Sequence, residues 1–197
     1  FRDWYSRMPQ KVFDSADFKV EARWAGKGRE MHLLSKPAML WILFFIILLT
    51  GASFGFVSSH WEITLLDSLT RPDVIARELK AYSPGQKEVH IWVTLTLDVI
   101  YPLAYGGFFA GLALLAFPKA GPWLAVPAGL TILTDLIEGV VQVLLLSSND
   151  TALIPIKSAL TSLKFTFLFV AAFIALIAIG TLVYKRVAGL FKTRDSQ

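Results

Sequence analysis

Four ionisable residues interrupt the otherwise apolar stretches of this chain: Asp98, Asp135, Glu138 and Lys164. Charged side chains are costly in hydrocarbon, so they usually face the interior of a helical bundle or a water-filled cavity. Three carboxylates against one ammonium leave excess negative charge, which favours either protonated carboxyl groups or a bound cation. We therefore expect acid–base chemistry or ligand binding here, with Glu138 or Asp135 as the acid or base. Lys164 would be the counter-charge and Asp98 the orienting group.

Further polar side chains recur at helical spacing beside these four residues and so share their helix faces. They are the candidate ligand-binding residues: His90, Thr94, Tyr101 and Tyr105 around Asp98, Gln142 beyond Glu138, and Thr161 before Lys164. Pro102 lacks the N–H that would bond the backbone carbonyl of residue 98, which leaves that acceptor free. The pattern predicts an outward-opening polar pocket in the membrane that binds or transforms a small amphipathic or lipid-like molecule.

The same residues allow a structural interpretation. Buried pairs of acids and lysines can hold membrane helices together and fix their register. The protein would then be an accessory or assembly subunit of a larger membrane protein complex, docked through residues 1–36 or the transmembrane surface. A third interpretation is proton or ion conduction, but the inner halves of the last two apolar stretches are almost entirely apolar, which disfavours it. The sequence does not decide whether the protein is an enzyme.

Cofactors are limited by the residue types present. The chain contains no cysteine, which excludes disulfides, thiolate metal sites and iron–sulfur clusters. No histidine lies beside Asp135 and Glu138, so no transition-metal site is expected. No cofactor can be inferred, and no motif predicts a nucleotide-binding loop or a nucleic-acid partner.

The elements that must position these residues are long apolar helices. A helix needs about 20 apolar residues to cross roughly 30 Å of hydrocarbon, and four stretches qualify. We place the spans at about 37–60, 89–117, 122–146 and 156–184, which makes residues 37–184 an all-α, four-helix transmembrane bundle. Counted from the outer ends of the spans, the four ionisable residues share a depth of roughly 13–18 Å.

The distribution of positive charge predicts the orientation. Thirteen lysines and arginines precede the first span, lie in the turn between the second and third spans, or follow the fourth. Five lie on the opposite side: Arg71, Arg77, Lys80, Lys87 and Lys157. Because cytoplasmic loops carry the excess of Lys and Arg, we expect both termini in the cytoplasm, with a bacterial inner (plasma) membrane as the location.

The segments outside the spans have patterns of their own. Residues 1–36 are basic and amphipathic, which predicts a cytoplasmic segment lying on membrane lipids, and residues 185–197 form a basic cytoplasmic tail. Without an initiator methionine, the chain is expected to continue before Phe1. In the external loop 61–88, a short helix is expected from about residue 70 to 83, with Ile75, Leu79 and Tyr82 on its apolar face. It would lie on the outer surface as a lid.

Histidines and glycines in the spans have simpler roles. His60 and His90 lie at the outer ends of adjacent spans, where an imidazole is stable at the membrane interface. Gly106, Gly107 and Gly111 form a small-residue face, which predicts close packing between helices.

Overall fold

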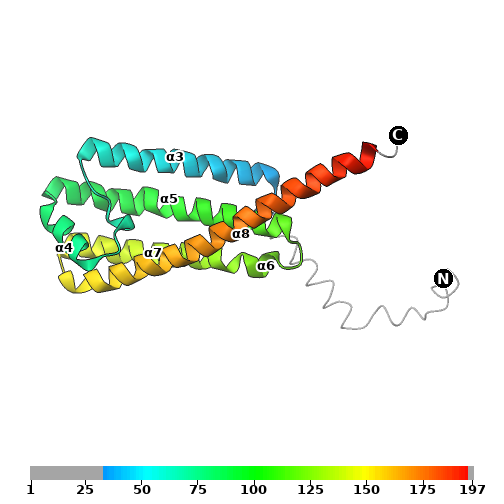
Figure 1. Cartoon of the computed structure of the whole chain (residues 1–197). Coiled ribbons are helices and arrows are strands. Elements are labelled where there is room, and N and C mark those ends of the chain that lie inside the picture. Colours follow the sequence, from blue (N-terminus) through cyan, green and yellow to red (C-terminus); the bar gives the residue numbers. More distant parts are fainter. Residues whose placement is uncertain (1–32, 195–197) are drawn as a thin grey trace, which may run out of the picture. The chain divides into compact units, whose positions relative to one another are not determined.

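The computed structural model describes residues 33–194, which are helical throughout apart from short connections and contain no strand (Figure 1). The α-helices are α3 (Pro37–Trp61), α4 (Pro72–Ala81), α5 (Pro84–Ala116), α6 (Gly121–Leu124), α7 (Val126–Ser148) and α8 (Ile154–Arg194). Two 3-10 turns, η3 (Leu66–Ser68) and η4 (Thr151–Leu153), complete the order. The predicted all-helical class is confirmed. Most of the amphipathic segment predicted at residues 1–36 lies outside the described residues, as do residues 195–197 of the tail.

Four helical segments within the described range are long and apolar enough to cross a membrane: α3, α5, α6 with α7, and residues 151–188 around α8. They match the four predicted stretches, but the helices extend further. α5 begins at Pro84, five residues early, because Ser83 and Gln86 form a reciprocal capping box at its start. α8 has 41 residues, about 60 Å at 1.5 Å per residue, and ends ten residues later than predicted.

Proline sets the start of most helices. Pro37, Pro72 and Pro84 lie in the first turns of α3, α4 and α5, where a missing N–H leaves no intrahelical bond unmade. Pro102 differs, because it lies buried inside α5 without ending the helix. Such prolines are tolerated in membrane helices where neighbouring helices cover the interrupted backbone.

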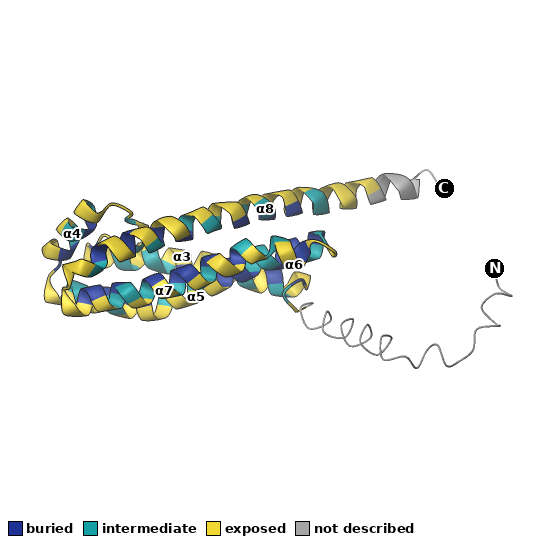
Figure 2. Ribbon diagram, turned by 90° about the horizontal axis from the view of Figure 1, so that it is seen from below, coloured by how far each residue is buried: buried dark blue, intermediate teal, exposed yellow. Residues whose placement is uncertain are grey.

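The helix α5 is the centre of the bundle, since it packs against α3, α7 and α8. α7 and α8 also pack closely on each other, whereas α3 contacts mainly α5 and is exposed over most of its surface. Much of the surface of α8 is exposed as well (Figure 2). α8 crosses the other helices obliquely, and its C-terminal part projects beyond them (Figure 1). At this inner end Lys185 of α8 donates to the last-turn carbonyl of Ala116, 3.0 Å away, and so fixes α8 to the end of α5.

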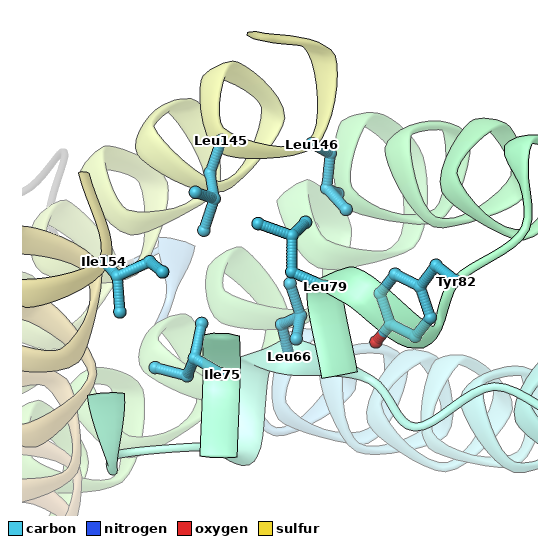
Figure 3. Packing of buried hydrophobic residues seen from close by; sticks show 7 residues of the cluster. All are labelled: Leu66, Ile75, Leu79, Tyr82, Leu145, Leu146 and Ile154. Atoms are coloured by element: carbon cyan, nitrogen blue, oxygen red, sulfur yellow. The ribbon is translucent and has the colours of Figure 1, made fainter. Parts of the chain in front are cut away.

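Residues 62–83, which we call the cap, cover the end of the bundle opposite α6. They leave α3 through Glu62, whose left-handed φ of 50° ends the helix, while Ile63 N–H donates to Ser58 O. The apolar face predicted for α4 is confirmed, because its side chains pack into one cluster with the ends of α7 and α8 (Figure 3). The cluster consists of Leu66, Ile75, Leu79, Tyr82, Leu145, Leu146 and Ile154.

Two cap residues have shifted ionisation. Burial, together with the charges of Glu78 and Asp67, raises the pKa of Tyr82, whose hydroxyl donates to the carbonyl of Thr64. On the exposed side, a hydrogen bond from Arg71 at 2.7 Å lowers the pKa of Asp73. Tyr82 therefore stays neutral, and its hydroxyl links the end of α4 to the extended segment at the start of the cap.

The glycine face of α5 provides close packing, as predicted. A Cβ at Gly106 would lie 2.4 Å from Ile132 Cγ1 and 3.3 Å from Ala128 O, both in α7. A Cβ at Gly111 would lie 2.5 Å from Leu34 O. The absence of a side chain at these two positions allows α7 and the start of the described chain to approach α5.

We predict that Gly106→Ala destabilises the folded protein by about 1–3 kcal/mol, because the added methyl group must displace Ile132. Gly129→Ala is the matched control on α7, since nothing lies within 4 Å of the new Cβ. The control should be neutral or stabilising by up to about 1 kcal/mol. Equilibrium unfolding in mixed detergent micelles measures both, and equal stability of the two variants would contradict the packing described here.

Candidate functional site

An ion-pair network joins α7 to α8 in the middle of the bundle. Glu138 Oε1 lies 3.1 Å from Lys157 Nζ and accepts a hydrogen bond from Thr161 Oγ1 at 2.6 Å. Glu138 Oε2 lies 2.6 Å from Lys164 Nζ. All three partners come from one face of α8, at positions 157, 161 and 164, which helical spacing places in line. The Glu138 side chain is 1% exposed, so its charge is compensated inside the protein rather than by solvent.

Lys157, which the sequence analysis counted with the lysines and arginines of the external side, lies inside the protein. Its side chain is fully buried, in the first turn of α8. An ammonium group has three donors, and Lys157 uses all of them, on Glu138, on the carbonyl of Leu66 and on the carbonyl of Leu69 at 3.2 Å. Lys157 thus ties α7, α8 and the 3-10 turn of the cap together.

The second half of the network is centred on Asp135. Its Oδ1 lies 3.0 Å from Lys164 Nζ, and its Oδ2 accepts a hydrogen bond from Tyr105 of α5 at 2.5 Å. Lys164 therefore bridges Asp135 and Glu138, which are three residues apart on α7. The cluster predicted from common depth exists for these residues. Both Asp135 oxygens are occupied, and so are both Glu138 oxygens.

Polar side chains of three helices hold the backbone of the cap. The Leu66 N–H donates to His90 Nε2 at 3.0 Å, and Ser158 donates to the carbonyl of Thr70. Gln142 Nε2 donates to Asp67 Oδ1 at 2.5 Å and to Thr94 Oγ1 at 2.9 Å. The cap is therefore bound through polar contacts to α5, α7 and α8 as well as through its apolar cluster.

His90, near the start of α5, is enclosed by the protein. The ring is completely buried and accepts a hydrogen bond from a backbone N–H, which can only donate. Nε2 therefore carries no proton and the ring is neutral. His90, Gln142 and Thr161, three of the predicted ligand-binding residues, are engaged in holding the protein together rather than lining a cavity.

A cavity of about 220 Å³ lies next to this network, with lining residues from α3, α5, α7, α8 and the cap. Its lining comprises Phe54 of α3, Asp98, Tyr101 and Tyr105 of α5, Asp135 of α7, Lys164, Phe165 and Leu168 of α8, and Leu65, Asp67 and Ser68 of the cap. Tyr101 stands edge-on to both Phe54 and Tyr105, with ring centroids 5.5 and 5.2 Å apart. Aromatic walls and a few converging polar groups are typical of small-molecule sites.

Asp98 is the exception among the buried acids. Its side chain is 7% exposed, and no group in residues 33–194 forms a hydrogen bond or an ion pair with its carboxyl group. Buried polar groups are nearly always hydrogen-bonded, and an unpartnered one calls for an explanation. The carboxyl group lines the cavity, so a molecule in the cavity can reach it.

The charges of the site leave two acids, one of them Asp98, without a counter-charge. Four carboxylates (Asp67, Asp98, Asp135 and Glu138) and two ammonium groups (Lys157 and Lys164) are grouped here, a formal balance of minus two. The ion pairs assign both lysines to Asp135 and Glu138. Asp67 and Asp98 remain, and both line the cavity.

The sequence identified five of the eleven residues that line the cavity. Asp98, Tyr101, Tyr105, Asp135 and Lys164 line the cavity, while Glu138 lies behind them without reaching it. Asp67 and Phe54 were not predicted. A polar residue in a loop and an aromatic residue in an apolar helix carry no signal of their own, so only the packing of the cap and α3 reveals them.

Comparison with protein-family models, with curated proteins and with solved structures finds no match for this chain. Within the described residues, no three His, Cys, Asp or Glu side chains are grouped so as to hold a metal ion. The cavity and its unpaired acids are therefore the features from which a function can be argued.

We predict that Lys157→Met costs about 3–5 kcal/mol of folding free energy, because it leaves Glu138 half-paired and two cap carbonyls without a donor. Residues 62–83 should then exchange backbone deuterium much faster than in the wild type. Lys80→Met, on the exposed side of α4, is the matched control and should change neither quantity. Wild-type protection of the cap in Lys157→Met would show that this lysine does not hold it.

Proposed function

We propose that the protein is an integral membrane protein with four spans and both termini in the cytoplasm. The four long apolar helices support this, and so does the charge distribution. With Lys157 buried in the protein, thirteen lysines and arginines precede α3 in the sequence, lie between α5 and α7 or follow residue 184, against four in residues 62–88. α5 and α8 exceed the roughly 30 Å of bilayer hydrocarbon and so must tilt or protrude.

The absence of native cysteines makes this topology directly testable. In right-side-out vesicles, a membrane-impermeant maleimide should label Lys80→Cys on the cap but should label Lys119→Cys only after permeabilisation. Both positions are exposed in the structure, so reactivity reports the side of the membrane rather than burial. Labelling of both variants from the same side would contradict the four-span arrangement.

We propose further that the cavity binds a small amphipathic molecule whose head group is cationic. The observation that carries this proposal is the unpartnered Asp98 carboxyl group on the cavity wall, next to the second uncompensated acid, Asp67. An organic ammonium group would supply the missing charge and donors, and it would lie among the rings of Tyr101, Tyr105 and Phe54, which favour cations at their faces. Lys164 uses two donors on acids, so its third is free for an oxygen of the ligand.

The geometry favours binding over acid–base catalysis by the residues first considered for it. Both oxygens of Glu138 and both oxygens of Asp135 are engaged by lysine, threonine or tyrosine donors. A general acid or base must reach the reacting group directly or through one water. Glu138 does not line the cavity and is therefore less suited than Asp98 to act as a general acid or base on a bound molecule.

We predict that Asp98→Asn weakens the binding of hexylamine by about 10- to 100-fold, as expected for the loss of one charge-assisted hydrogen bond. The free energy of unfolding without ligand should stay the same or rise, because an unpaired buried acid is removed. Calorimetric titration of protein in lipid nanodiscs measures the affinity, with empty nanodiscs subtracted.

The control for this experiment is Asp73→Asn, the same substitution at an exposed acid on the cap. It should bind hexylamine as the wild type does. Failure of the wild type to bind, or equal binding by Asp98→Asn, would contradict the proposal.

The alternative remains an accessory subunit of a membrane complex. Asp135, Glu138, Lys157 and Lys164 form close ion pairs, as expected if these residues serve only to hold the helices together. The exposed apolar surface of α3, including Trp41, Phe45 and Phe56, would then serve as the docking face. Asp98 separates the two functions, because a purely structural cluster has no use for an unpartnered acid facing a cavity.

A further inference from the structure

A second opening leads to Asp98 from the other side of α5. It is an apolar groove of about 350 Å³ between α5 and α7, on the outer surface of the bundle. Its walls include Leu95 and Val140, which are 53% and 61% exposed, and in a membrane they face the lipid chains. Asp98 and Asp135 are the only ionisable side chains among its lining residues.

The two openings meet at the same carboxyl group. Asp98 and Asp135 line both the cavity and the groove, so each opening reaches the same two side chains. On the groove side Gly139 lies against Asp98, since a Cβ there would lie 3.9 Å from Asp98 Oδ2 and 3.5 Å from Thr94 Cγ2. Because Gly139 has no side chain, Asp98 can be approached from the lipid.

We infer that the groove holds the hydrocarbon chain of the ligand, which makes the ligand a long-chain amine that enters sideways from the bilayer. This inference rests on the proposed function and names the ligand class. The charge of Asp98 and the apolar walls above it match the two ends of such a molecule: the ammonium group pairs with the carboxylate, and the chain follows Val140 and Leu95 to the lipid.

The lining of each opening supports this division. The cavity presents Asp67, Lys164 and Tyr101 to a head group, whereas the groove adds only aliphatic side chains, Thr94 and Gly139 to the two shared acids. The volumes of the two openings are in the range of small-molecule sites when taken together. A chain in the groove would lie beside lipid, so it needs no opening in the cap to bind.

The test compares ethylamine with decylamine in nanodiscs, using the wild type, Gly139→Leu and Leu95→Trp. Each substitution places a large side chain in the groove, one from its floor and one from its rim. At Gly139 an added Cβ would make only ordinary van der Waals contacts, and equilibrium unfolding of Gly139→Leu checks that the variant is folded. Gly129→Leu is the matched control, because it adds the same side chain to α7 at a position with nothing within 4 Å.

We expect both groove variants to bind decylamine at least about tenfold more weakly than the wild type, with a much smaller change for ethylamine. Gly129→Leu should bind both amines as the wild type does. If the wild type binds both amines and the groove variants lose both equally or neither, the groove inference is overturned while the amine site stands. If the wild type binds neither amine, the proposed function itself fails.

Discussion

The contact on which the rest of the structure depends is the pairing of Glu138 with two lysines of α8. A single buried carboxylate receives Lys157 from the outer side and Lys164 from the inner side, with Thr161 between them. Removing any one partner would leave an uncompensated charge in a region of low dielectric constant, which is far more costly than leaving the pair intact. The register of α7 against α8 is fixed by this contact, and the positions of the cap and of the cavity follow from it.

The two lysines connect Glu138 to different parts of the protein. Lys157 binds cap carbonyls, so the cap is positioned by the same residue that neutralises Glu138. Lys164 reaches Asp135, and Asp135 in turn fixes the Tyr105 hydroxyl of α5. With both lysines committed in this way, no internal cation remains for Asp98 in the described part of the chain. Asp98 thus has no paired cation because both lysines are committed to Asp135 and Glu138.

Sequence reasoning succeeded where periodicity carries the information. Apolar length predicted the four long helices, and the spacing of Ile75, Leu79 and Tyr82 predicted α4 and its buried face. Common depth brought Asp135, Glu138 and Lys164 together correctly.

What the sequence could not supply was long-range packing. Lys157 looks like a loop residue until one knows that carbonyls about 90 residues earlier surround it. His90 looks interfacial until the cap lies over it. The cavity is lined by residues of α3, α5, α7, α8 and the cap, and the spacing of residues along single helices does not predict how five segments enclose a space.

The position of both essential lysines on the last helix has a consequence for biosynthesis. Asp98, Asp135 and Glu138 leave the ribosome before Lys157 and Lys164 do, since chains are made from the N-terminus. During that interval the first three helices carry acids without their native counter-charges, and the carbonyls of Leu66 and Leu69 await their donor. Packing of α8 therefore supplies the lysines for Asp135 and Glu138 and the donor for the cap carbonyls in one step. The C-terminal helix thus completes the assembly of the bundle.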